Sequence, residues 1–513
     1  MRQVVLAASL GTVFEWYDFF LYGSLAVFFS TLFYPPGNDT AAFLASLATF
    51  GAGFAVRPLG ALIFGALGDL IGRKRTFLIT MVIMGLSTVF VGVLPTYPQV
   101  GIWAPILLVI LRLAQGLAVG GEYGGAATYV AEHAPVGRRG YATSWLQTTG
   151  TAAFLLSLVV ILACRVGVGE DAFRTWGWRL PFLTSVVLLA VSLYIRLKLE
   201  ESPVFEQMKA EGRLSRAPIR ESFGDGSNLQ RVLITLFGIT TGMTVIWYTS
   251  QFYALFFMQS LLQVDYITSC LIFGAGLTLG LPLIVFFGAL SDRIGRKPIM
   301  IAGLVLGGLT LIPAFHALAD FSNPGLSAFA GKNRIAISAD TGCTFSLFAK
   351  PASDCDKARN FFSRNGLSYA LTDAPLGTGV TTTIGEAKLR GFDDASYRKA
   401  LSDTGFRTTP KSINYAGAIA ILVWLSALTG MVYGPMAAFL VEMFPAPIRS
   451  TSLSLPYHLG VGLLGGFLPF VASALVVYYG SIFAGLWYPT TIALATAAIG
   501  IVFLPETKDR QLL

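Results

Sequence analysis

Apolar runs of about 20 residues recur along almost the whole chain, and they constrain the fold more than any other feature of the sequence. A helix of that length crosses the roughly 30 Å hydrocarbon core of a bilayer, whereas the strand of a membrane barrel needs only about 10 residues. Charged residues make up 12% of the chain, which is about half their share in an average soluble protein. We therefore expect an all-α protein that crosses a membrane many times.

Twelve runs are long enough to span a bilayer. Six precede a polar stretch, at 4–30, 42–67, 76–94, 105–130, 145–168 and 179–198. Six follow it, at 231–258, 267–290, 299–318, 414–440, 452–478 and 482–504. The first run is longer than the core of a signal peptide, so we expect it to remain as the first span.

Basic residues predict which side of the membrane each connection faces, because cytoplasmic loops carry most of the Lys and Arg. They cluster at 72–75, 137–139, 196–231 and 292–297. The short connections near 31–41, 94–105 and 259–266 have none. We expect a bacterial inner-membrane protein with both chain ends in the cytoplasm, and the net charge of +8 needs no nucleic-acid partner to explain it.

Two segments of the first half of the chain return in the second half. GALGDLIGRK at 65–74 recurs as GALSDRIGRK at 288–297. GTVFEWYDFFLY at 11–22 aligns with GMTVIWYTSQFY at 242–253. Internal repeats of this kind are typical of transporters built from two related halves. We therefore expect two pseudo-symmetric halves of six helices each.

A third repeated motif locates an insertion within the second half. Glu132, Pro135 and Arg139 are matched by Glu442, Pro445 and Arg449, at a wider spacing than that of the other two pairs. Extra residues therefore lie between the ninth and tenth spans. The expected parts are an N-terminal half at 1–198, a cytoplasmic linker at 199–230, a second half at 231–318 and 413–513, and an extracytoplasmic insertion at 319–412.

The insertion is polar and rich in glycine, and its alternating runs NRIAIS and GVTTTIGE predict a small β-containing cap. Cys343 and Cys355 lie outside the predicted spans, where an oxidising compartment would let them form a disulfide. Cys164 and Cys270 lie within spans, where we expect them to pack. A lid or surface decoration is the simplest interpretation, and a domain that captures substrate or binds a partner is the alternative.

Ionisable side chains inside the predicted spans mark the candidate site, because each costs about 2.5 to 3.5 kcal/mol at the centre of a bilayer. The first span carries Glu15 and Asp18, the second Arg57, and the fourth Arg112 and Glu122. Their positions along straight helices place Glu15 level with Arg57, and Asp18 within reach of Arg112.

Two interpretations of these charges remain open. They could form an ion-pair network that only fixes helix packing. Alternatively, they could carry protons and substrate. The equivalents of Glu15 and Asp18 in the second half are Ile246 and Thr249, so the repeat does not require acids here, which favours the second interpretation. An anionic substrate that competes for an arginine would drive protonation of the acid paired with it. We take Asp18 as the first choice for the proton site, with Glu15 and Glu122 next.

Aromatic and amide side chains of four spans are further candidates for the walls of a substrate cavity, although most membrane aromatics only pack. With Arg57 and Arg112 as the anion-binding groups, the candidates are Trp16, Tyr17, Tyr22, Gln115, Gln147, Trp247, Tyr248, Gln251 and Tyr253. For His458, in the eleventh span, we favour a hydrogen-bonded structural role over a proton relay.

The repeated loops predict an inner gate. Their glycines permit a tight turn and their basic residues fit the topology, while an Asp at the same place in both copies suits a helix N-terminus or an ion pair between the halves. The candidates are Asp69, Arg73, Glu132, Arg139, Asp292, Arg296, Glu442 and Arg449.

The two G-x-x-x-D-x-x-G-R-K loops resemble the signature of the major facilitator superfamily. The motifs similar to its metabolite:proton symporters are EWYDFFLYG at 15–23, FAVRPLGALIFGALGDLIGRK at 54–74, LRLAQGLAVGGEYGGAATYVAEHAP at 111–135, LEESPVF at 199–205 and VEMFPAPIR at 441–449. The resemblance implies import of organic acids or zwitterions with protons, and an Asp18–Arg112 pair. Leu70 departs from the pattern, which has Arg or Lys at that place.

We therefore expect a single chain, without metal or cofactor, that imports a small carboxylate with protons by alternating access. A symporter of zwitterionic osmolytes such as proline or betaine is the alternative, with aromatic rings binding the cation. A receptor is disfavoured because no cytoplasmic output domain is recognisable. An enzyme is disfavoured because no nucleophile–base pair or metal-ligand group emerges.

Overall fold

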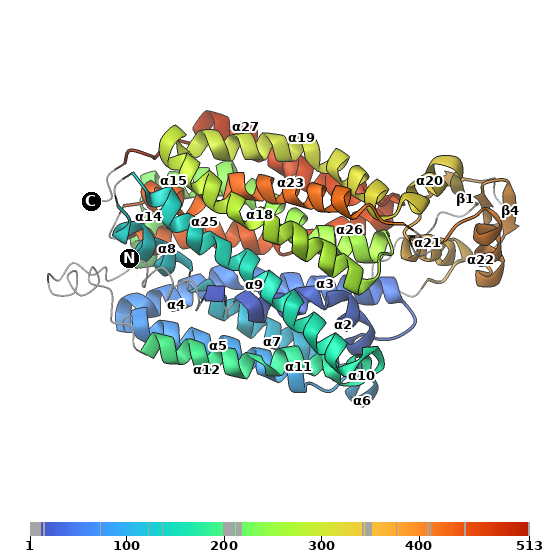
Figure 1. Cartoon of the computed structure of the whole chain (residues 1–513), viewed down its shortest axis with the longest axis horizontal. Helices are drawn as coiled ribbons and strands as arrows, with labels where there is room; N and C mark the ends of the chain where they lie inside the picture. The colour runs from blue at the N-terminus through green and yellow to red at the C-terminus, as the bar shows by residue number, and fades with distance from the viewer. Residues whose placement is uncertain are drawn as a thin grey trace.

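The computed structural model describes a helical bundle with a small α/β unit at one end (Figure 1). The described residues are 12–13, 16–71, 73–121, 123–135, 137–197, 211, 218–340, 343, 351–375, 377–407, 410, 412–445 and 448–510. We call the two ends of the bundle the insertion end, where the α/β unit lies, and the linker end, where α14 (Pro218–Gly224) lies.

The helices of the first half begin with a segment at Trp16–Ser24, which is bent by 67° from the next helix. The helices that follow are α2 (Ala26–Phe33), α3 (Asp39–Ala55), α4 (Arg57–Ile71), α5 (Arg73–Val93), α6 (Tyr97–Val100), α7 (Trp103–Gly120), α8 (Tyr123–His133), α9 (Arg139–Val168), α10 (Glu170–Thr175), η1 (Gly177–Arg179), α11 (Leu180–Leu183) and α12 (Ser185–Leu197).

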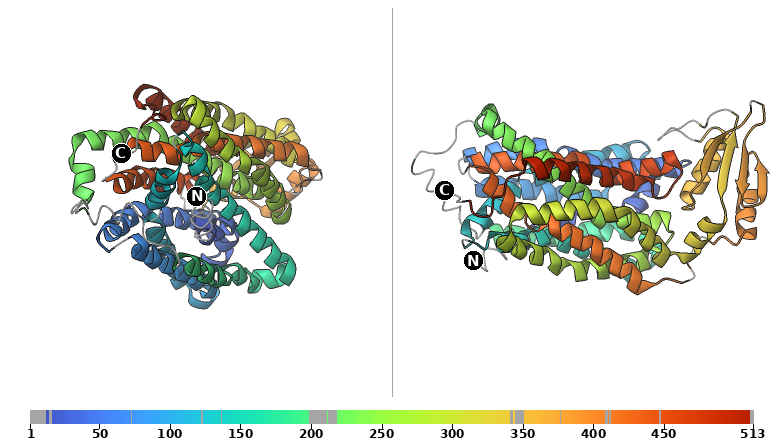
Figure 2. Two further views of the ribbon diagram at one scale, coloured as in Figure 1. Left: turned by 60° about the vertical axis from the view of Figure 1, so that its left-hand side comes forward. Right: turned by 90° about the horizontal axis from the view of Figure 1, so that it is seen from above.

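The second half lies beside the first (Figure 2). After α14, its helices are α15 (Gly226–Thr235), η2 (Leu236–Thr240), α16 (Thr241–Tyr248), η3 (Thr249–Tyr253), α17 (Ala254–Phe256), η4 (Phe257–Leu261), α18 (Tyr266–Ile294), α19 (Arg296–Ser322), α23 (Tyr415–Tyr433), α24 (Met436–Met443), α25 (Arg449–Leu459), η6 (Gly460–Gly465), α26 (Leu468–Tyr479), η7 (Ala484–Leu486) and α27 (Trp487–Phe503).

Over the residues that the structure describes, each of the twelve predicted spans coincides with a helical stretch. Within the described residues, 10 stretches are long and apolar enough to cross a membrane, and the bent pair Trp16–Ser24 and Ala26–Phe33 makes 11. The span expected at 76–94 is a shorter apolar helix, Leu78–Val93. The expectation of an all-α membrane protein with this arrangement of spans is confirmed.

The seventh span, Gly226–Leu261, is helical throughout but irregular. It contains the three π-helical segments η2, η3 and η4. A π-helical turn holds one more residue than an α-helical turn, so it shifts the side chains beyond it to another face, and such turns often occur at functional sites. This span therefore presents different faces to the first half along its length.

The α/β unit contains a four-stranded sheet with the order β2-β1-β3-β4. Its elements are α20 (Pro324–Lys332), β1 (Ile335–Ala339), α21 (Asp354–Arg364), β2 (Ala370–Asp373), β3 (Thr381–Ile384), β4 (Ala387–Arg390) and α22 (Asp394–Asp403). β1 pairs with β2 in parallel and with β3 antiparallel. β1 and β3 are the two alternating runs from which the sequence predicted strands.

Two links define the insertion further. Cys343 and Cys355 form a disulfide, with their Cα atoms 5.5 Å apart. The chain leaves and re-enters the bundle at one place, because the backbone N–H of Asn414 donates to the carbonyl of Phe321 at 2.8 Å. The α/β unit is thus an addition to one corner of the second half.

Candidate functional site

Two arginines of the first half, Arg57 at the start of α4 and Arg112 on α7, are wholly buried. Glycines let α7 approach α3 and α4 closely. A Cβ atom on Gly116 of α7 would lie 1.7 Å from the carbonyl oxygen of Gly53 on α3, and one on Gly120 would lie 2.2 Å from that of Arg57 on α4. Any larger residue would push α7 away from these helices, so the glycines bring both cations into one part of the core.

Arg57 lies in a cage of aromatic rings. Its guanidinium carbon is 3.8 Å from the ring centre of Phe54, 4.5 Å from that of Phe19 and 4.7 Å from that of Trp16. None of its three guanidinium nitrogens has a hydrogen-bond partner in the part of the chain that the structure describes. Ring faces attract a cation but leave its five N–H donors unsatisfied. Arg57 is therefore a buried cation that can receive an anionic group.

Arg112 also lies over aromatic rings, and its Nε and Nη2 have no partner among the described residues, but its Nη1 is held by polar contacts. Its Nη1 donates to Oε1 of Gln115 at 2.6 Å and to the carbonyl of Phe19 at 3.3 Å. Nε2 of Gln115 in turn donates to Oγ1 of Thr88 at 2.8 Å. The ring of Phe19 lies 4.0 Å from the guanidinium of Arg112, so the same ring touches both arginines. Arg112 is thereby fixed in the site.

Of the three acids predicted for the site, Asp18 alone lies within the described residues. Asp18 is 5% exposed, but the ion pair between Asp18 and Arg112 that the resemblance implied is not formed between these two described side chains. Arg112 bonds Gln115 and a backbone carbonyl in its place. Glu15 and Glu122 lie outside the described residues.

An aromatic pocket lies between the two halves, next to Arg57. Trp16, which stacks on Arg57, lines it. The other lining residues are Phe20 and Gly150 of the first half, and Met243, Thr244, Trp247, Tyr248, Tyr433, Tyr457 and Val461 of the second. Its volume is only about 10 Å³, which is about the room for one water molecule. In this conformation the rings close the central pocket, and a ligand would require the halves to separate.

The remaining candidates fall into two groups. Trp247 and Tyr248 line the central pocket, and Gln147 borders it by donating to the hydroxyl of Tyr123 and the carbonyl of Tyr433. The others lie elsewhere: Tyr17 donates to the carbonyl of Pro181, Tyr22 donates to the carbonyl of Ser46, Gln251 is buried with an unbonded Oε1, and Tyr253 lines a cavity nearer the insertion end.

His458 is buried edge-on to Tyr457, with ring centres 5.2 Å apart. Neither ring nitrogen has a hydrogen-bond partner among the described residues. The hydrogen-bonded role expected from the sequence is therefore wrong in this conformation.

The sequence analysis missed three aromatic residues of the pocket, Phe20, Tyr433 and Tyr457. One signal was available. The third repeated motif, extended toward the N-terminus from Glu132 and Glu442, matches Tyr123 with Tyr433 at the same spacing. Tyr123 and Tyr457 stack at 3.7 Å between ring centres, and the hydroxyls of Tyr433 and Tyr457 are 3.2 Å apart.

Six of the eight predicted gate residues meet at the linker end. Arg449 pairs with Glu132 at 2.8 Å and Arg139 pairs with Glu442 at 3.7 Å, so both ion pairs connect the two halves. Arg296 pairs within the second half with Glu442 at 3.1 Å and with Asp292 at 2.7 Å. For Asp69 and Arg73, the other two candidates, the side chains lie outside what the structure describes.

Asp292 caps a helix of the opposite half. Its two carboxylate oxygens accept hydrogen bonds from the backbone N–H groups of Gly140 and Tyr141, each at 2.8 Å, at the start of α9. A helix N-terminus favours a negative charge because its first N–H groups are unpaired. A Cβ atom on Gly140 would lie 2.4 Å from the carbonyl oxygen of Gly288. The linker end is therefore closed, and closed tightly.

Glu506 was not predicted, and it reinforces the gate loop from the same half. Its carboxylate accepts from the backbone N–H groups of Arg296 and Lys297, at 2.9 and 3.1 Å. Burial raises the pKa of Glu506, but hydrogen bonds from four backbone N–H groups outweigh it and hold that pKa below its usual range. No repeated motif marks this residue in the sequence.

Comparisons with known proteins agree on a family. The family model described as "Sugar (and other) transporter" matches residues 4–232. The inner membrane metabolite transport protein YhjE of Escherichia coli (strain K12) is 30% identical over 515 residues, which cover 100% of this chain and 96% of that protein. The proline/betaine transporter of the same organism is 39% identical over 324 residues, or 61% of this chain, and the match spans 64% of that transporter's length.

Among solved structures, the xylose transporter XylE from E. coli in a partially occluded inward-open conformation superposes with a TM-score of 0.63 at 17% identity, covering 99% of both chains. That likeness concerns the fold. The match to YhjE extends over the whole sequence, so the chain belongs to the major facilitator superfamily, among its metabolite transporters.

Proposed function

We propose that this protein imports a small organic acid anion together with protons, by alternating access across the cytoplasmic membrane. The observation that carries the proposal is Arg57, a wholly buried cation whose guanidinium nitrogens have no partner among the described residues and whose ring contact Trp16 lines the pocket between the halves. A guanidinium binds a carboxylate through two parallel hydrogen bonds. A cargo carboxylate would supply the hydrogen-bond acceptors that the guanidinium of Arg57 lacks.

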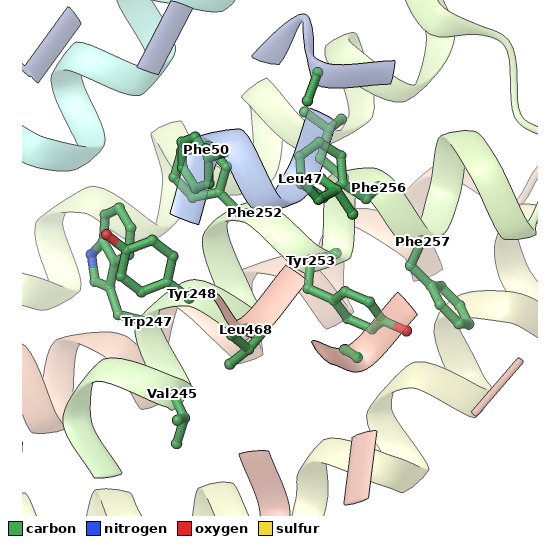
Figure 3. Packing of buried hydrophobic residues seen from close by; sticks show 14 of the residues in the cluster. Leu47, Phe50, Val245, Trp247, Tyr248, Phe252, Tyr253, Phe256, Phe257 and Leu468 are labelled. Atoms are coloured by element: carbon green, nitrogen blue, oxygen red, sulfur yellow. The ribbon is translucent and has the colours of Figure 1, made fainter. Parts of the chain in front are cut away.

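The closure of both ends supports alternating access. Ion pairs between the halves close the linker end. Toward the insertion end, the ring of Phe252 lies 5.2 Å from that of Phe20, 5.1 Å from that of Phe50 and 4.5 Å from that of Phe154, measured between centres. These rings form an aromatic layer, of which Figure 3 shows Phe50 and Phe252 beside Trp247 and Tyr248 of the central pocket. Cargo would enter and leave by rocking of one half against the other.

For orientation we propose that the linker end faces the cytoplasm and the insertion end faces outside. The basic clusters at 137–139 and 292–297 support this, since both contribute to the gate at the linker end. The disulfide between Cys343 and Cys355 also supports it, because disulfides persist outside the cytoplasm.

The direct test is uptake by the purified protein in liposomes with an imposed pH gradient, screened over small carboxylates. We expect an acid exterior to drive concentrative uptake of at least one of them. The relatives of this chain include a shikimate transporter and an alpha-ketoglutarate permease of E. coli, so those two acids begin the screen. Flux that does not respond to acidity on either side would contradict proton coupling.

Asp18→Asn is expected to abolish proton-driven accumulation and to leave counterflow exchange within about twofold of the wild type. Asn cannot take up a proton, whereas Asp18 is a buried acid in a membrane span, where ionisable residues commonly mark proton pathways. Paired accumulation and counterflow assays measure the difference, with Asp18→Glu as the control that keeps an ionisable group. Normal accumulation in the Asn variant would reject the assignment, and Glu15 and Glu122 would be tested next.

A second candidate, symport of a zwitterion such as proline or betaine, is favoured by the walls of the pocket. Trp16, Trp247, Tyr248 and Tyr457 surround it, and aromatic rings bind a quaternary ammonium by cation–π attraction. The match to the proline/betaine transporter supports this candidate. Competition between betaine and cation-free carboxylates in the same liposomes separates the two, because only the zwitterion uses both Arg57 and the rings.

A further inference from the structure

The insertion is attached firmly to the second half. Nη2 of Arg359, on α21, donates to the carbonyls of Val477 and Tyr478 at 3.1 and 3.3 Å. The backbone N–H of Tyr369 donates to the carbonyl of Gly480 at 2.7 Å. A Cβ atom on Gly366 would lie 1.8 Å from the carbonyl oxygen of Leu261, where φ is +66° and favours glycine. The insertion therefore moves with the second half.

The end of α21 also reaches the first half. Arg364 forms an ion pair with Asp39, and the hydroxyl of Thr40 donates to Oδ1 of Asn360. Asp39 and Thr40 are the first residues of α3, the second span of the first half. A rocking motion that parts the halves at this end must break both contacts. They form a latch from the insertion to the opposite half.

A cavity of about 310 Å³ lies under this latch, which we call the outer cavity. That volume is at the lower end of the range for small-molecule sites. Its walls come from α2 and α3, from the end of the seventh span, from α26, and from Ser363 and Arg364 of the insertion. Among its described lining residues, Arg364 and Asp39 are the charged ones.

The inner end of the outer cavity is polar but unsatisfied. Tyr253 lines it and is 1% exposed, and its hydroxyl has no hydrogen-bond partner within the described chain. Oε1 of Gln259, on the same wall, also lacks one. Figure 3 shows Tyr253 on one side of Phe252 and Trp247 with Tyr248 on the other. The aromatic layer thus separates the outer cavity from the central pocket.

We propose that the outer cavity is a loading site for the cargo anion, in which Arg364 exchanges the carboxylate of Asp39 for that of the cargo. This rests on the proposed function, which gives the cargo a carboxylate. The pair is suited to exchange because the side chains of Arg364 and Asp39 are 55% and 54% exposed, and exposed ion pairs are weak. An arriving anion therefore opens the latch and occupies the site it covered.

The exchange gives the insertion a role in the transport cycle. With cargo on Arg364, only the hydrogen bond from Thr40 to Asn360 still joins the insertion to α3, so the halves part more easily at this end. The central pocket, now nearly without volume, can then widen toward Arg57. Tyr253, on η3 of the seventh span, lines the outer cavity and offers a hydroxyl that has no partner among the described residues.

The test uses a single reporter cysteine, S260C, in a chain whose free cysteines Cys164 and Cys270 are replaced by Ala. Ser260 lines the outer cavity and is partly buried. Its rate of reaction with a membrane-impermeant maleimide reports access to the cavity. Because both D39N and R364Q remove the ion pair, we expect both to speed labelling by about threefold to fivefold. R398Q is the matched control, since Arg398 pairs with Asp394 elsewhere on the insertion, and it should label at the original rate.

Protection by cargo then separates a latch from a binding site. The probes are alpha-ketoglutarate, shikimate and betaine, each tested alone, with a neutral sugar as the control. D39N frees Arg364 for the probe, so half-protection should occur at a lower concentration than in the original protein. R364Q removes the anion-binding group, so half-protection should need at least about tenfold more probe than in D39N. D39N and R364Q should thus both raise the labelling rate of S260C. D39N should lower the probe concentration needed for half-protection, and R364Q should raise it.

Three outcomes would overturn the proposal. Unchanged labelling in D39N and R364Q would show that the latch does not cover the cavity. Equal protection in both variants would show that Arg364 does not hold the anion. Protection by the neutral sugar alone would show a site for another class of ligand. None of these readouts depends on transport, so a protein that fails the liposome assay but passes this test would refute the proposed function and not the outer site.

Discussion

Arg57→Met is expected to abolish concentrative uptake and to raise the thermal stability of the cargo-free protein. Both effects follow from a buried cation without a partner among the described residues. Such a charge destabilises the fold, and the unbranched Met side chain fits the cage of Trp16, Phe19 and Phe54 that holds the guanidinium. Loss of a buried charge contact costs about 2 to 5 kcal/mol in binding, which raises the half-saturating cargo concentration at least about 30-fold.

Arg112→Met is the matched comparison, and it should lower stability. Removal of its guanidinium leaves Oε1 of Gln115 and the carbonyl of Phe19 without their donor, at a cost of about 1 to 3 kcal/mol for a buried unsatisfied group. Thermal unfolding of the purified variants in detergent measures both changes, and liposome uptake measures the activity. If Arg57→Met unfolds at a lower temperature than the original protein, Arg57 has a structural partner and its place in the cargo site is wrong.

Asp292→Asn is expected to hold the transporter open at the linker end and to stop accumulation. Asn can accept at one of the two positions where Asp292 receives the N–H groups of Gly140 and Tyr141, and it loses the charge that Arg296 pairs with. The bonds to Gly140 and Tyr141 are the ones that cross between the halves, and a hydrogen bond to a charged group contributes about 1.5 to 3 kcal/mol. The ratio of closed to open forms should therefore fall by at least about 10-fold. Gly140→Val should act in the same direction, because its side chain collides with the backbone of Gly288.

Access to Ser144 measures this opening. Ser144 is wholly buried on α9, where a Cβ atom on Gly288 would lie 2.4 Å from it. A cysteine at position 144 should react with maleimide in the Asp292→Asn background and stay protected otherwise. Glu506→Gln is the control, because Glu506 also accepts backbone N–H groups, but its bonds lie within one half. Equal labelling in both backgrounds would mean that Asp292 supports its own loop and does not close the gate.

The sequence predicted the architecture well because the forces that decide it are visible in a single chain. Apolar length alone locates the spans. Backbone N–H and C=O groups in lipid must be hydrogen-bonded within the protein, and a helix satisfies them within a single segment. Alternation predicted β1 and β3 inside the insertion. The gate residues Asp292 and Glu442 were found because a repeated motif marks each of them, and the structure brings both to the junction between the halves.

The candidate site was predicted less completely because it depends on helix faces and bends. Asp18 was matched to Arg112 by depth alone, but depth does not fix the helix face on which a side chain lies, and Arg112 bonds Gln115 instead. The π-helical segment η3 likewise rotates the seventh span, so that Trp247 lines the central pocket and Tyr253 the outer cavity. No periodicity in the sequence marks such a turn.

The hydrogen bond between Asn414 and Phe321 brings the two ends of the α/β unit together at one corner of the bundle. A cassette whose ends meet can be excised and bridged by a few residues without displacing α19 or α23, since short loops close at little entropic cost. The same geometry would let the α/β unit be inserted into a transporter that lacks it. Comparing the solutes taken up by that transporter with and without the unit would then measure its influence on solute choice.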